Sequence, residues 1–239
     1  SYDYGQKNII HYHDKIFKDL FTNKKEAVNF INRYLKILNT QNELFQENLE
    51  KCNTEFITKD KNKLESDILY KIKETQIYIL IEHQSRVDYS MPKRILEYCV
   101  EIMRMVAKTR RINYRTDKLP VVYPIVLYTG RRKWNANTEL SQMQEKINGI
   151  ERNLKSSYTL VDSNDFSIEE LITERSAISK AILMEKIRNK KELIEILAQL
   201  IKQPLNDEEK NFLIDIITNI AKEKIDKKQY DKFMKRISR

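Results

Sequence analysis

The scarcity of glycine is the feature that most narrows the folds open to this chain. Its 239 residues include only three glycines, Gly5, Gly130 and Gly149, whereas glycine makes up about 7% of an average protein. A P-loop (GxxxxGK) and a dinucleotide-binding fingerprint (GxGxxG) both need closely spaced glycines, which let backbone amides approach phosphate groups. Neither motif can be built here, so ATP-driven and nicotinamide-dependent chemistry by these routes are excluded.

The cysteines and the short apolar runs indicate the cellular setting. Cys52 and Cys99 are isolated, so the chain has no CxxC pair for zinc or redox chemistry and no disulfide framework. The longest apolar runs, Ile77–Ile81 and Val121–Tyr128, are far shorter than the ~20 residues that span a bilayer. The N-terminus has no hydrophobic signal core, although it also lacks an initiator methionine. We therefore expect a soluble, cytoplasmic protein that makes no use of a membrane.

Hydrophobic periodicity predicts an α/β domain that is followed by helices. Apolar residues recur at helical spacing over residues 13–38, and a second helix begins near Pro92. Strands are predicted at residues 54–58, 64–72, 76–84, 121–128 and 158–161. Beyond Asp165 the spacing is helical throughout. We therefore expect the α/β fold class and two parts, a domain at residues 1–165 and a C-terminal helical region at residues 166–239.

Two acidic residues meet in the predicted hairpin of residues 64–84. If residues 74–75 form a two-residue turn, the numbers of cross-strand partners sum to 149, and Asp67 lies opposite Glu82. Strand alternation places both acids and Gln84 on one face of the hairpin. The two Cβ atoms would then be about 4.5–5.5 Å apart, a separation at which like charges destabilise a sheet.

Two carboxylates held side by side need a proton or a cation between them. Oxygen ligands of this kind suit Mg²⁺ or Mn²⁺, which bind few carboxylates, keep several waters and contact phosphates. Such an ion activates water and neutralises charge on a phosphodiester. The alternative is that both acids point to solvent, or that a turn one residue longer shifts the register. The hairpin pattern alone leaves both interpretations open.

Positive charge is concentrated directly after the acid pair. The chain carries a net charge of +9, and residues 86–133 hold twelve lysines and arginines against four acids, which gives this segment +8. Clustered cations beside a metal-type acid pair favour a nucleic-acid backbone as the partner. The alternative is a solvated helix face followed by a basic loop. Four interleaved aromatic residues could stack on bases or only pack: Tyr89, Tyr114, Tyr128 and Trp134.

Four motifs, in order along the chain, resemble the recombination-promoting nuclease (Rpn) or putative transposase family. The main one joins residues 65–70 (ESDILY) to residues 79–85 (ILIEHQS), similar to a family signature SDLLY…LIEHQS. The others are HDKIFK at residues 13–18, MPKR at residues 91–94 with Tyr98, and the segment from Leu119-Pro120 through Tyr128-Thr129-Gly130 to Trp134. The resemblance extends from residue 13 to about residue 135, which is more than half of the chain.

This resemblance implies a fold and a metal-dependent activity. The family is placed in the PD-(D/E)XK nuclease superfamily, whose restriction-endonuclease-like core has the order α-β-β-β-α-β and whose members cleave DNA with a metal. By resemblance, Asp67 is the metal-binding aspartate and Glu82 is the acid of the E-x-K element, which here ends in Gln84. A glutamine carries no charge and cannot act as a base. Transition-state charge must therefore be neutralised by the metal or by another cation.

The family pattern and the basic segment extend the candidate site. Lys18 and Arg94 are candidates for the missing cation, and Asp14 is a candidate third metal ligand from the first helix. The expected nucleic-acid contacts are Lys18, Arg94, Arg131, Arg132 and Lys133. His83 alternates to the strand face opposite Glu82, so a buried, hydrogen-bonded histidine is favoured over a general base.

We therefore expect a Mg²⁺- or Mn²⁺-dependent DNA endonuclease, an E-x-Q variant with low sequence specificity, because no base-reading module is apparent. Its family name links it to recombination and mobile elements. The alternative is a nucleic-acid-binding or partner-binding protein without catalysis, which the missing motif lysine favours and the retained acid pair opposes. The apolar faces of residues 166–239 could form a homodimer or bind a regulator, or they could pack on the nuclease core.

Overall fold

The computed structural model describes residues 15–35, 43–54, 68–150, 154–219 and 226–237. Contacts divide the chain into two compact units, one formed by residues 13–164 and one that includes residues 165–239. The first unit contains a sheet with helices, and the described residues of the second are helical. The chain therefore has the α/β class that its hydrophobic periodicity predicts.

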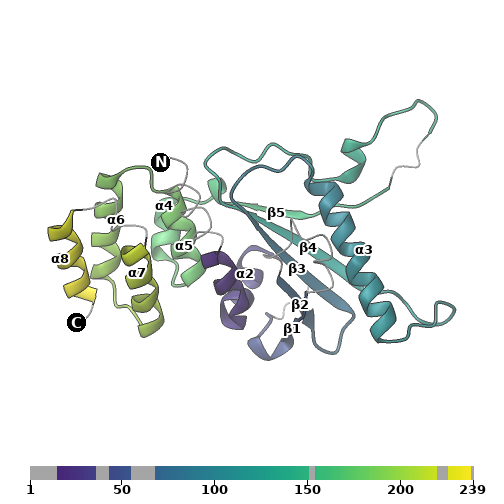
Figure 1. The fold of residues 1–239 in the computed structure, drawn as a ribbon, viewed down its shortest axis with the longest axis horizontal. Helices are drawn as coiled ribbons and strands as arrows, with labels where there is room; N and C mark the ends of the chain where they lie inside the picture. The colour runs from purple at the N-terminus through teal and green to yellow at the C-terminus, as the bar shows by residue number, and fades with distance from the viewer. Residues whose placement is uncertain (1–14, 36–42, 55–67, 151–153, 220–225, 238–239) are drawn as a thin grey trace, which may run out of the picture. The chain divides into compact units, whose positions relative to one another are not determined.

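A five-stranded mixed sheet forms the centre of the first unit (Figure 1). Its strands are β1 (Leu49–Cys52), β2 (Ile68–Ile72), β3 (Ile77–Gln84), β4 (Val121–Tyr128) and β5 (Thr159–Asp162). They lie in chain order across the sheet. The β1–β2 and β2–β3 pairs are antiparallel, whereas β3, β4 and β5 run parallel to one another. The ends of β3, β4 and β5 that follow the chain direction therefore meet at one edge.

Helix α3 (Met91–Thr109) connects the parallel strands β3 and β4 and covers one face of the sheet. Ser90 precedes its first turn and Pro92 lies within that turn, as predicted, because proline there sacrifices no helical hydrogen bond. The buried cluster on this face combines strand and helix residues: Leu69, Tyr78, Leu80, Met91, Ile95, Tyr98, Ile102, Val106, Val126, Tyr128, Trp134 and Tyr158.

The other face of the sheet contacts the N-terminal helices. Residues 15–22 are helical, and α2 covers Lys24–Tyr34. The Tyr70 hydroxyl of β2 donates hydrogen bonds to the backbone oxygens of Phe21 (2.6 Å) and Thr22 (3.1 Å). The prediction of one uninterrupted helix is wrong. Asn23 breaks it, because the Asn23 side chain accepts a hydrogen bond from the Lys25 amide and so caps a new helix.

The hairpin register agrees with the sequence prediction. Ile68 pairs with Ile81 and Lys71 with Tyr78, so each pair of numbers sums to 149. Glu74 in the turn has a positive φ of 62°. This register, together with strand alternation, places Glu82 and Gln84 on the α3 face of β3.

The other strands agree with the periodicity to within a residue or two, apart from the first. β1 begins at Leu49, ahead of the segment 54–58 that the sequence favours, and residues 55–58 lie outside the described residues. The pattern missed β1 because its sequence, LEKC, has little apolar character. The described residues of this unit also form three short 3₁₀ segments: η1 (Gln46–Asn48), η3 (Leu140–Met143) and η4 (Ser163–Asp165), the last of which ends in the second unit.

The second unit consists of helices: α4 (Ile168–Thr173), α5 (Ala177–Lys186), α6 (Lys190–Lys202), α7 (Asp207–Asn219) and α8 (Lys227–Ile237). The apolar face of α6 is buried at Leu193, Leu197 and Leu200, in agreement with the helical spacing predicted beyond Asp165. The Asn206 side chain accepts a hydrogen bond from the Glu209 amide at the start of α7. In the described part of the chain, no helix is both long enough and apolar enough to cross a bilayer.

Candidate active site

Glu82 is a buried carboxylate near the end of the central strand β3. Its side chain is 1% exposed, among apolar residues of the α3 face. Burial raises the Glu82 pKa to about 7, the Arg94 guanidinium and an amide hydrogen bond from Gln84 oppose this rise, and the negative charge of Asp88 adds to it. A carboxyl group with so high a pKa in a folded protein is a functional-site candidate, because an acid normally avoids such burial.

The cation that faces Glu82 is Arg94, on the first turn of α3. Arg94 Nη2 lies 2.8 Å from Glu82 Oε1 and 3.0 Å from the Tyr98 hydroxyl, while Nη1 donates to Asp88 Oδ2. Burial alone would disfavour the Arg94 charge, but these partners outweigh it and raise its pKa. The arginine therefore stays charged and is held from three sides.

Asp88 holds the guanidinium from the loop that precedes α3. Its Oδ1 accepts hydrogen bonds from the Ser90 amide (2.8 Å) and the Ser90 hydroxyl (2.6 Å), and its Oδ2 accepts from Arg94. Burial alone would raise the Asp88 pKa, but the hydrogen bonds from Ser90 and Arg94 lower it below the ordinary value. Asp88 thus carries a stable negative charge that fixes the position of Arg94.

The two oxygens of Glu82 are used unequally. Gln84 Nε2 donates to Oε1 at 2.8 Å, and Arg94 donates to the same atom. Glu82 Oε2 is buried and makes no hydrogen bond with any described residue. A buried carboxylate oxygen without a partner is costly, and it is the hard oxygen ligand that Mg²⁺ or Mn²⁺ takes. The residues present therefore fit one ligand position of the metal site that the sequence implies.

The two other predicted ligands, Asp67 and Asp14, lie outside the described residues. Among the residues that the structure describes, no cluster of three or more acidic, histidine or cysteine side chains could hold a metal ion. Asp67 directly precedes Ile68, and Ile68 pairs with Ile81, the residue before Glu82. The described ladder therefore ends one residue short of the predicted acid pair.

The predicted basic residues fall in two places. Arg131, Arg132 and Lys133 are exposed and follow β4, whose last residue, Tyr128, pairs with Gln84. The loop that carries them therefore begins at the same edge of the sheet as Gln84, at the end of β3. Lys18, by contrast, is exposed on the helical segment that contacts the opposite face of the sheet. The structure therefore brings Arg94, Glu82 and Gln84 together and leaves Lys18 on another side.

His83 is a buried residue of the opposite sheet face, as the alternation predicts. Its Nε2 lies 2.7 Å from the Thr129 hydroxyl, and its ring stacks on Phe17 at 4.2 Å between centroids. Its side chain alternates away from Glu82 along β3. This arrangement agrees with a packed, hydrogen-bonded histidine.

Sequence analysis did not assign Asp88 and Tyr98 to the site. From the sequence, Tyr98 is named only as part of a family motif, and Asp88 is given no role. The available signal was spacing: Tyr98 follows Arg94 by four residues, which places both on one helix face. The Asp88–Arg94 contact depends on the path of the loop before α3, which no periodicity reveals.

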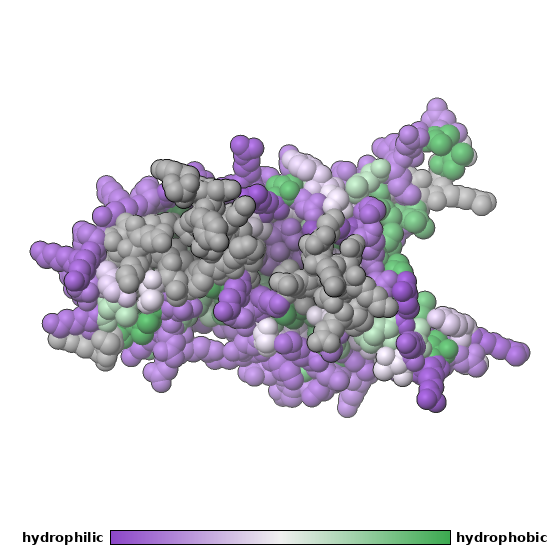
Figure 2. Space-filling model, viewed as in Figure 1, coloured by the Kyte–Doolittle hydropathy of each residue, from purple (hydrophilic) through white to green (hydrophobic). Residues whose placement is uncertain are grey.

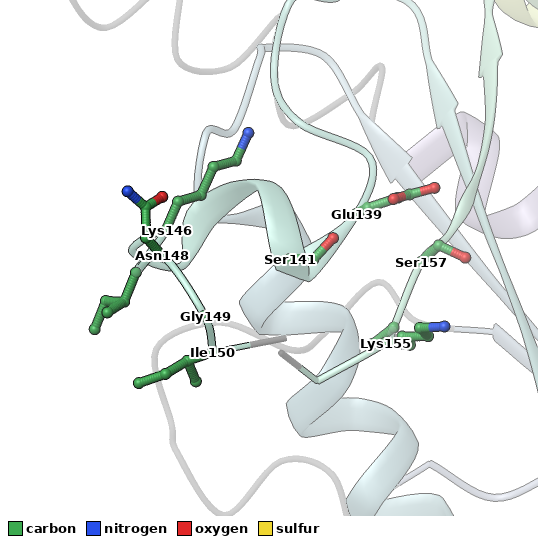
Figure 3. A pocket seen from close by; sticks show the side chains of 10 residues that line it. Glu139, Ser141, Lys146, Asn148, Gly149, Ile150, Lys155 and Ser157 are labelled. Atoms are coloured by element: carbon green, nitrogen blue, oxygen red, sulfur yellow. The ribbon is translucent and has the colours of Figure 1, made fainter. Parts of the chain in front are cut away.

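A separate cavity of about 790 Å³ lies in an arm whose described residues are 139–150 and 154–157. Figure 3 shows its lining, which includes Glu139, Ser141 and Lys155 but no residue of the Glu82 cluster. In Figure 2, hydrophobic atoms gather on this arm at the upper right. Its exposed apolar residues are Met143, Ile147, Ile150 and Leu154. Although this cavity is large, its described lining holds one carboxylate, Glu139, and lacks the grouped charges of the Glu82 cluster.

Curated relatives of this chain are named nucleases. It is 27% identical over 198 residues to "Recombination-promoting nuclease RpnD" of Escherichia coli O157:H7, which covers 79% of this chain and 72% of the relative. It is 26% identical over 195 residues to "Recombination-promoting nuclease RpnC" of Escherichia coli strain K12, which covers 79% of this chain and 62% of the relative. This chain thus spans less than two thirds of the second relative.

Another relative carries a different name. The chain is 28% identical over 127 residues to "Inactive recombination-promoting nuclease-like protein RpnE" of Escherichia coli strain K12, which covers 49% of this chain and 39% of the relative. No solved structure matches this chain.

The family comparison covers most of both units. The model described as "Putative transposase, YhgA-like" matches residues 11–213. This range includes the hairpin, α3, the basic loop after β4 and most of the C-terminal helices. The family predicted from the sequence motifs is confirmed, and the chain, two of whose curated relatives are named recombination-promoting nucleases, belongs to the YhgA-like transposase family.

Proposed function

We propose that this protein is a divalent-metal-dependent endonuclease that hydrolyses DNA phosphodiester bonds with low sequence specificity. The observation that carries the proposal is Glu82: a buried carboxylate with one oxygen held by Gln84 and Arg94 and one buried oxygen that no described residue contacts. An ion-binding role accounts for that oxygen, since burial of an idle acceptor costs about 1–3 kcal/mol.

In this proposal Asp67 is the second metal ligand and Asp14 the third. The β2–β3 ladder supports the choice of Asp67, because one further pair in the same register would set Asp67 opposite Glu82. When bound there, Mg²⁺ or Mn²⁺ supplies a Lewis acid that activates water and neutralises phosphate charge.

Arg94 takes the place of the missing motif lysine in this proposal. Gln84 keeps the position but uses its amide to orient Glu82 Oε1. Arg94 brings a permanent positive charge to the same oxygen and is held by Asp88 and Tyr98. A guanidinium fixed at this place stabilises charge that develops on a phosphoryl oxygen, because it needs no reorganisation during the reaction.

The fold supports a restriction-endonuclease-like core. The described elements follow the order helix, β1, β2, β3, α3 and β4, which is the α-β-β-β-α-β order of that superfamily. The acidic residue on β3 and the exposed basic loop after β4 lie at the same edge of the sheet. A phosphate backbone seated on that loop passes next to Glu82 and Arg94.

Plasmid nicking by the purified full chain tests this proposal. We expect Mg²⁺ or Mn²⁺ to support nicking, and a chelator, Asp67→Ala and Glu82→Gln each to abolish it. Glu97→Gln is the matched control, since Glu97 is an exposed acid that pairs with Lys93 on α3. Nicking that survives in both acid variants, or that needs no metal, would contradict the proposed site.

A DNA-binding protein without catalysis is the second candidate, favoured by the relative that is named inactive and by the uncharged Gln84. Thermal unfolding separates the two candidates, because a ligand that binds only the folded state raises Tm. A Tm increase with Mn²⁺ that disappears in Asp67→Ala supports the metal site. DNA binding without this increase and without nicking supports the second candidate.

A further inference from the structure

The loop after β4 is held by a set of buried polar contacts from the end of β5. Asp162 is 4% exposed, and its Oδ2 accepts a hydrogen bond from the Trp134 amide at 3.0 Å. Its Oδ1 accepts from the Asn164 amide (2.9 Å) and from the Asn164 side chain (2.8 Å). These three donors satisfy a buried carboxylate that would otherwise destabilise the fold.

Asn164 extends this set to the backbone of the loop itself. Its Nδ2 donates to the carbonyl oxygens of Gly130 (3.0 Å) and Arg132 (3.4 Å). The Tyr128 hydroxyl donates to the same Arg132 carbonyl. The loop is thus fixed at its first, third and fifth residues, through side chains that reach its backbone from β4, β5 and η4.

Gly130 shows how closely the loop lies over β4. A Cβ atom at this position would come within 2.3 Å of the Tyr128 side chain, at both its Cε2 atom and its hydroxyl oxygen. Only glycine fits such an approach without a shift of the Tyr128 ring. One of the 3 glycines of the chain therefore stands at the point where the loop backbone lies against Tyr128.

The side chains that the loop presents are all cationic. Arg131, Arg132 and Lys133 are exposed, and in the described part of the chain no carboxylate forms an ion pair with them. Three adjacent like charges repel one another. The hydrogen bonds to the loop backbone therefore hold these three cations close together despite their repulsion. Such a fixed cluster of positive charge favours the binding of an external polyanion.

The same edge carries the Glu82 site. Gln84 pairs with Tyr128, and Tyr128 pairs with Asp162, so these three residues form one row across the parallel strands. The contacts of Asp162 and Asn164 thus connect this row of strand residues to the loop of residues 130–134.

We propose that Asp162 and Asn164 are positioning residues for DNA binding: they contact no DNA, but they hold the backbone of residues 130–134 so that Arg131, Arg132 and Lys133 meet successive phosphates. This inference rests on the proposed function in one respect, the identity of the polyanion as DNA. It goes beyond that function because it assigns affinity for the DNA backbone to two residues without positive charge, the buried Asp162 and the half-buried Asn164.

A double-mutant cycle on DNA affinity tests the inference. The full chain is titrated with a fluorescent DNA duplex, without a divalent metal, at several salt concentrations. Asn164→Ala leaves the net charge unchanged, yet we expect it to weaken binding about fivefold or more, since it removes two loop hydrogen bonds. We also expect the slope of log affinity against log salt to become shallower by about 1, as one phosphate contact is lost.

The second arm of the cycle neutralises the loop by Arg131→Gln, Arg132→Gln and Lys133→Gln together. In that background Asn164→Ala should change the affinity less than about twofold, because the side chain acts only through those cations. Asn148→Ala, an exposed asparagine of the same unit, is the matched control and should bind as the unchanged protein does. Asp162→Asn should behave as Asn164→Ala does, provided that its thermal transition shows a folded protein.

The outcomes separate this inference from the proposed function. If the unchanged protein binds no DNA at any salt concentration, this inference fails, while nicking with Mg²⁺ or Mn²⁺ still decides the proposed function by itself. If it binds DNA but Asn164→Ala binds equally well, only the positioning role is wrong. Equal losses in both backgrounds would mean that Asn164 acts through general stability, which also overturns the inference.

Discussion

Arg94 Nη2 and Glu82 Oε1 lie 2.8 Å apart and join the first turn of α3 to the central strand β3. The Glu82 side chain is 1% exposed and that of Arg94 is 15% exposed, so water screens this pair poorly. Arg94 also pairs with Asp88, which makes it the shared cation of two carboxylates. The position of Glu82, the proposed metal ligand, therefore depends on this guanidinium together with the Gln84 amide.

Replacing Arg94 should destabilise the protein strongly. Arg94→Met leaves the buried Glu82 carboxylate with only the Gln84 amide as a partner, and breaking a buried pair costs about 3–5 kcal/mol. We expect the free energy of unfolding in urea to fall by about 3 kcal/mol. Arg104→Met removes an exposed pair with Glu101 on the same helix and should cost less than about 1 kcal/mol. Equal losses in the two variants would contradict a special role for Arg94.

His83 should matter for stability and not for the cleavage step. It faces away from Glu82, where it contacts Thr129 and Phe17. We expect His83→Gln to lower Tm and to keep plasmid nicking within about threefold of the unchanged protein at a temperature where both are folded. Loss of a general base lowers the rate by about 10²–10⁴-fold, so a decrease of that size would show that His83 takes part in catalysis.

The thiol of Cys99 should react slowly and make stability depend on alkaline pH. Burial raises the Cys99 pKa to about 11, against 9.0 for an unperturbed thiol. The thiolate is the nucleophile, so we expect Cys99 to react with a disulfide reagent at pH 8 at least tenfold more slowly in the folded protein than in urea. Cys52→Ser isolates this signal, because Cys52 is the other cysteine of the chain.

The sign of the pH effect follows from the same shift. Above pH 9 the unfolded chain releases the Cys99 proton while the folded chain keeps it, so unfolding becomes easier as the pH rises from about 9 to about 11. Urea unfolding of Cys99→Ser should show a smaller loss of stability over that interval. An identical loss in the unchanged protein and in this variant would contradict a raised pKa for this half-buried thiol.

Lys180 should be a structural cation of the C-terminal unit. It is 2% exposed, and its Nζ donates to the carbonyl oxygens of Leu171 (2.9 Å), Ile172 (2.6 Å) and Glu174 (2.6 Å), where α4 ends. Burial lowers its pKa. Lys180→Met removes a charged donor that these three carbonyls share and should cost about 2–3 kcal/mol in urea unfolding. Lys191→Met, at an exposed position of α6, should change stability by less than about 0.5 kcal/mol.

The sequence alone determined what depends on neighbouring residues. Strand alternation and a short turn predicted the β2–β3 register, and the same alternation placed Glu82 and Gln84 on one face and His83 on the other. Pro92 marked the start of α3. These features are readable because the strand period and helix-start preferences are local properties of the chain. The family, too, followed from motifs of consecutive residues.

Tertiary structure alone decided which distant residues meet. The contact between Asp88 and Arg94 depends on the loop that leads into α3, and the contact between Asn164 and Arg132 joins residues 32 positions apart. The capping hydrogen bond at Asn23 overrode an apolar pattern that by itself favours one continuous helix. Side-chain hydrogen bonds and charges act over a few ångströms of space and without a sequence period, so only the folded chain shows where they form.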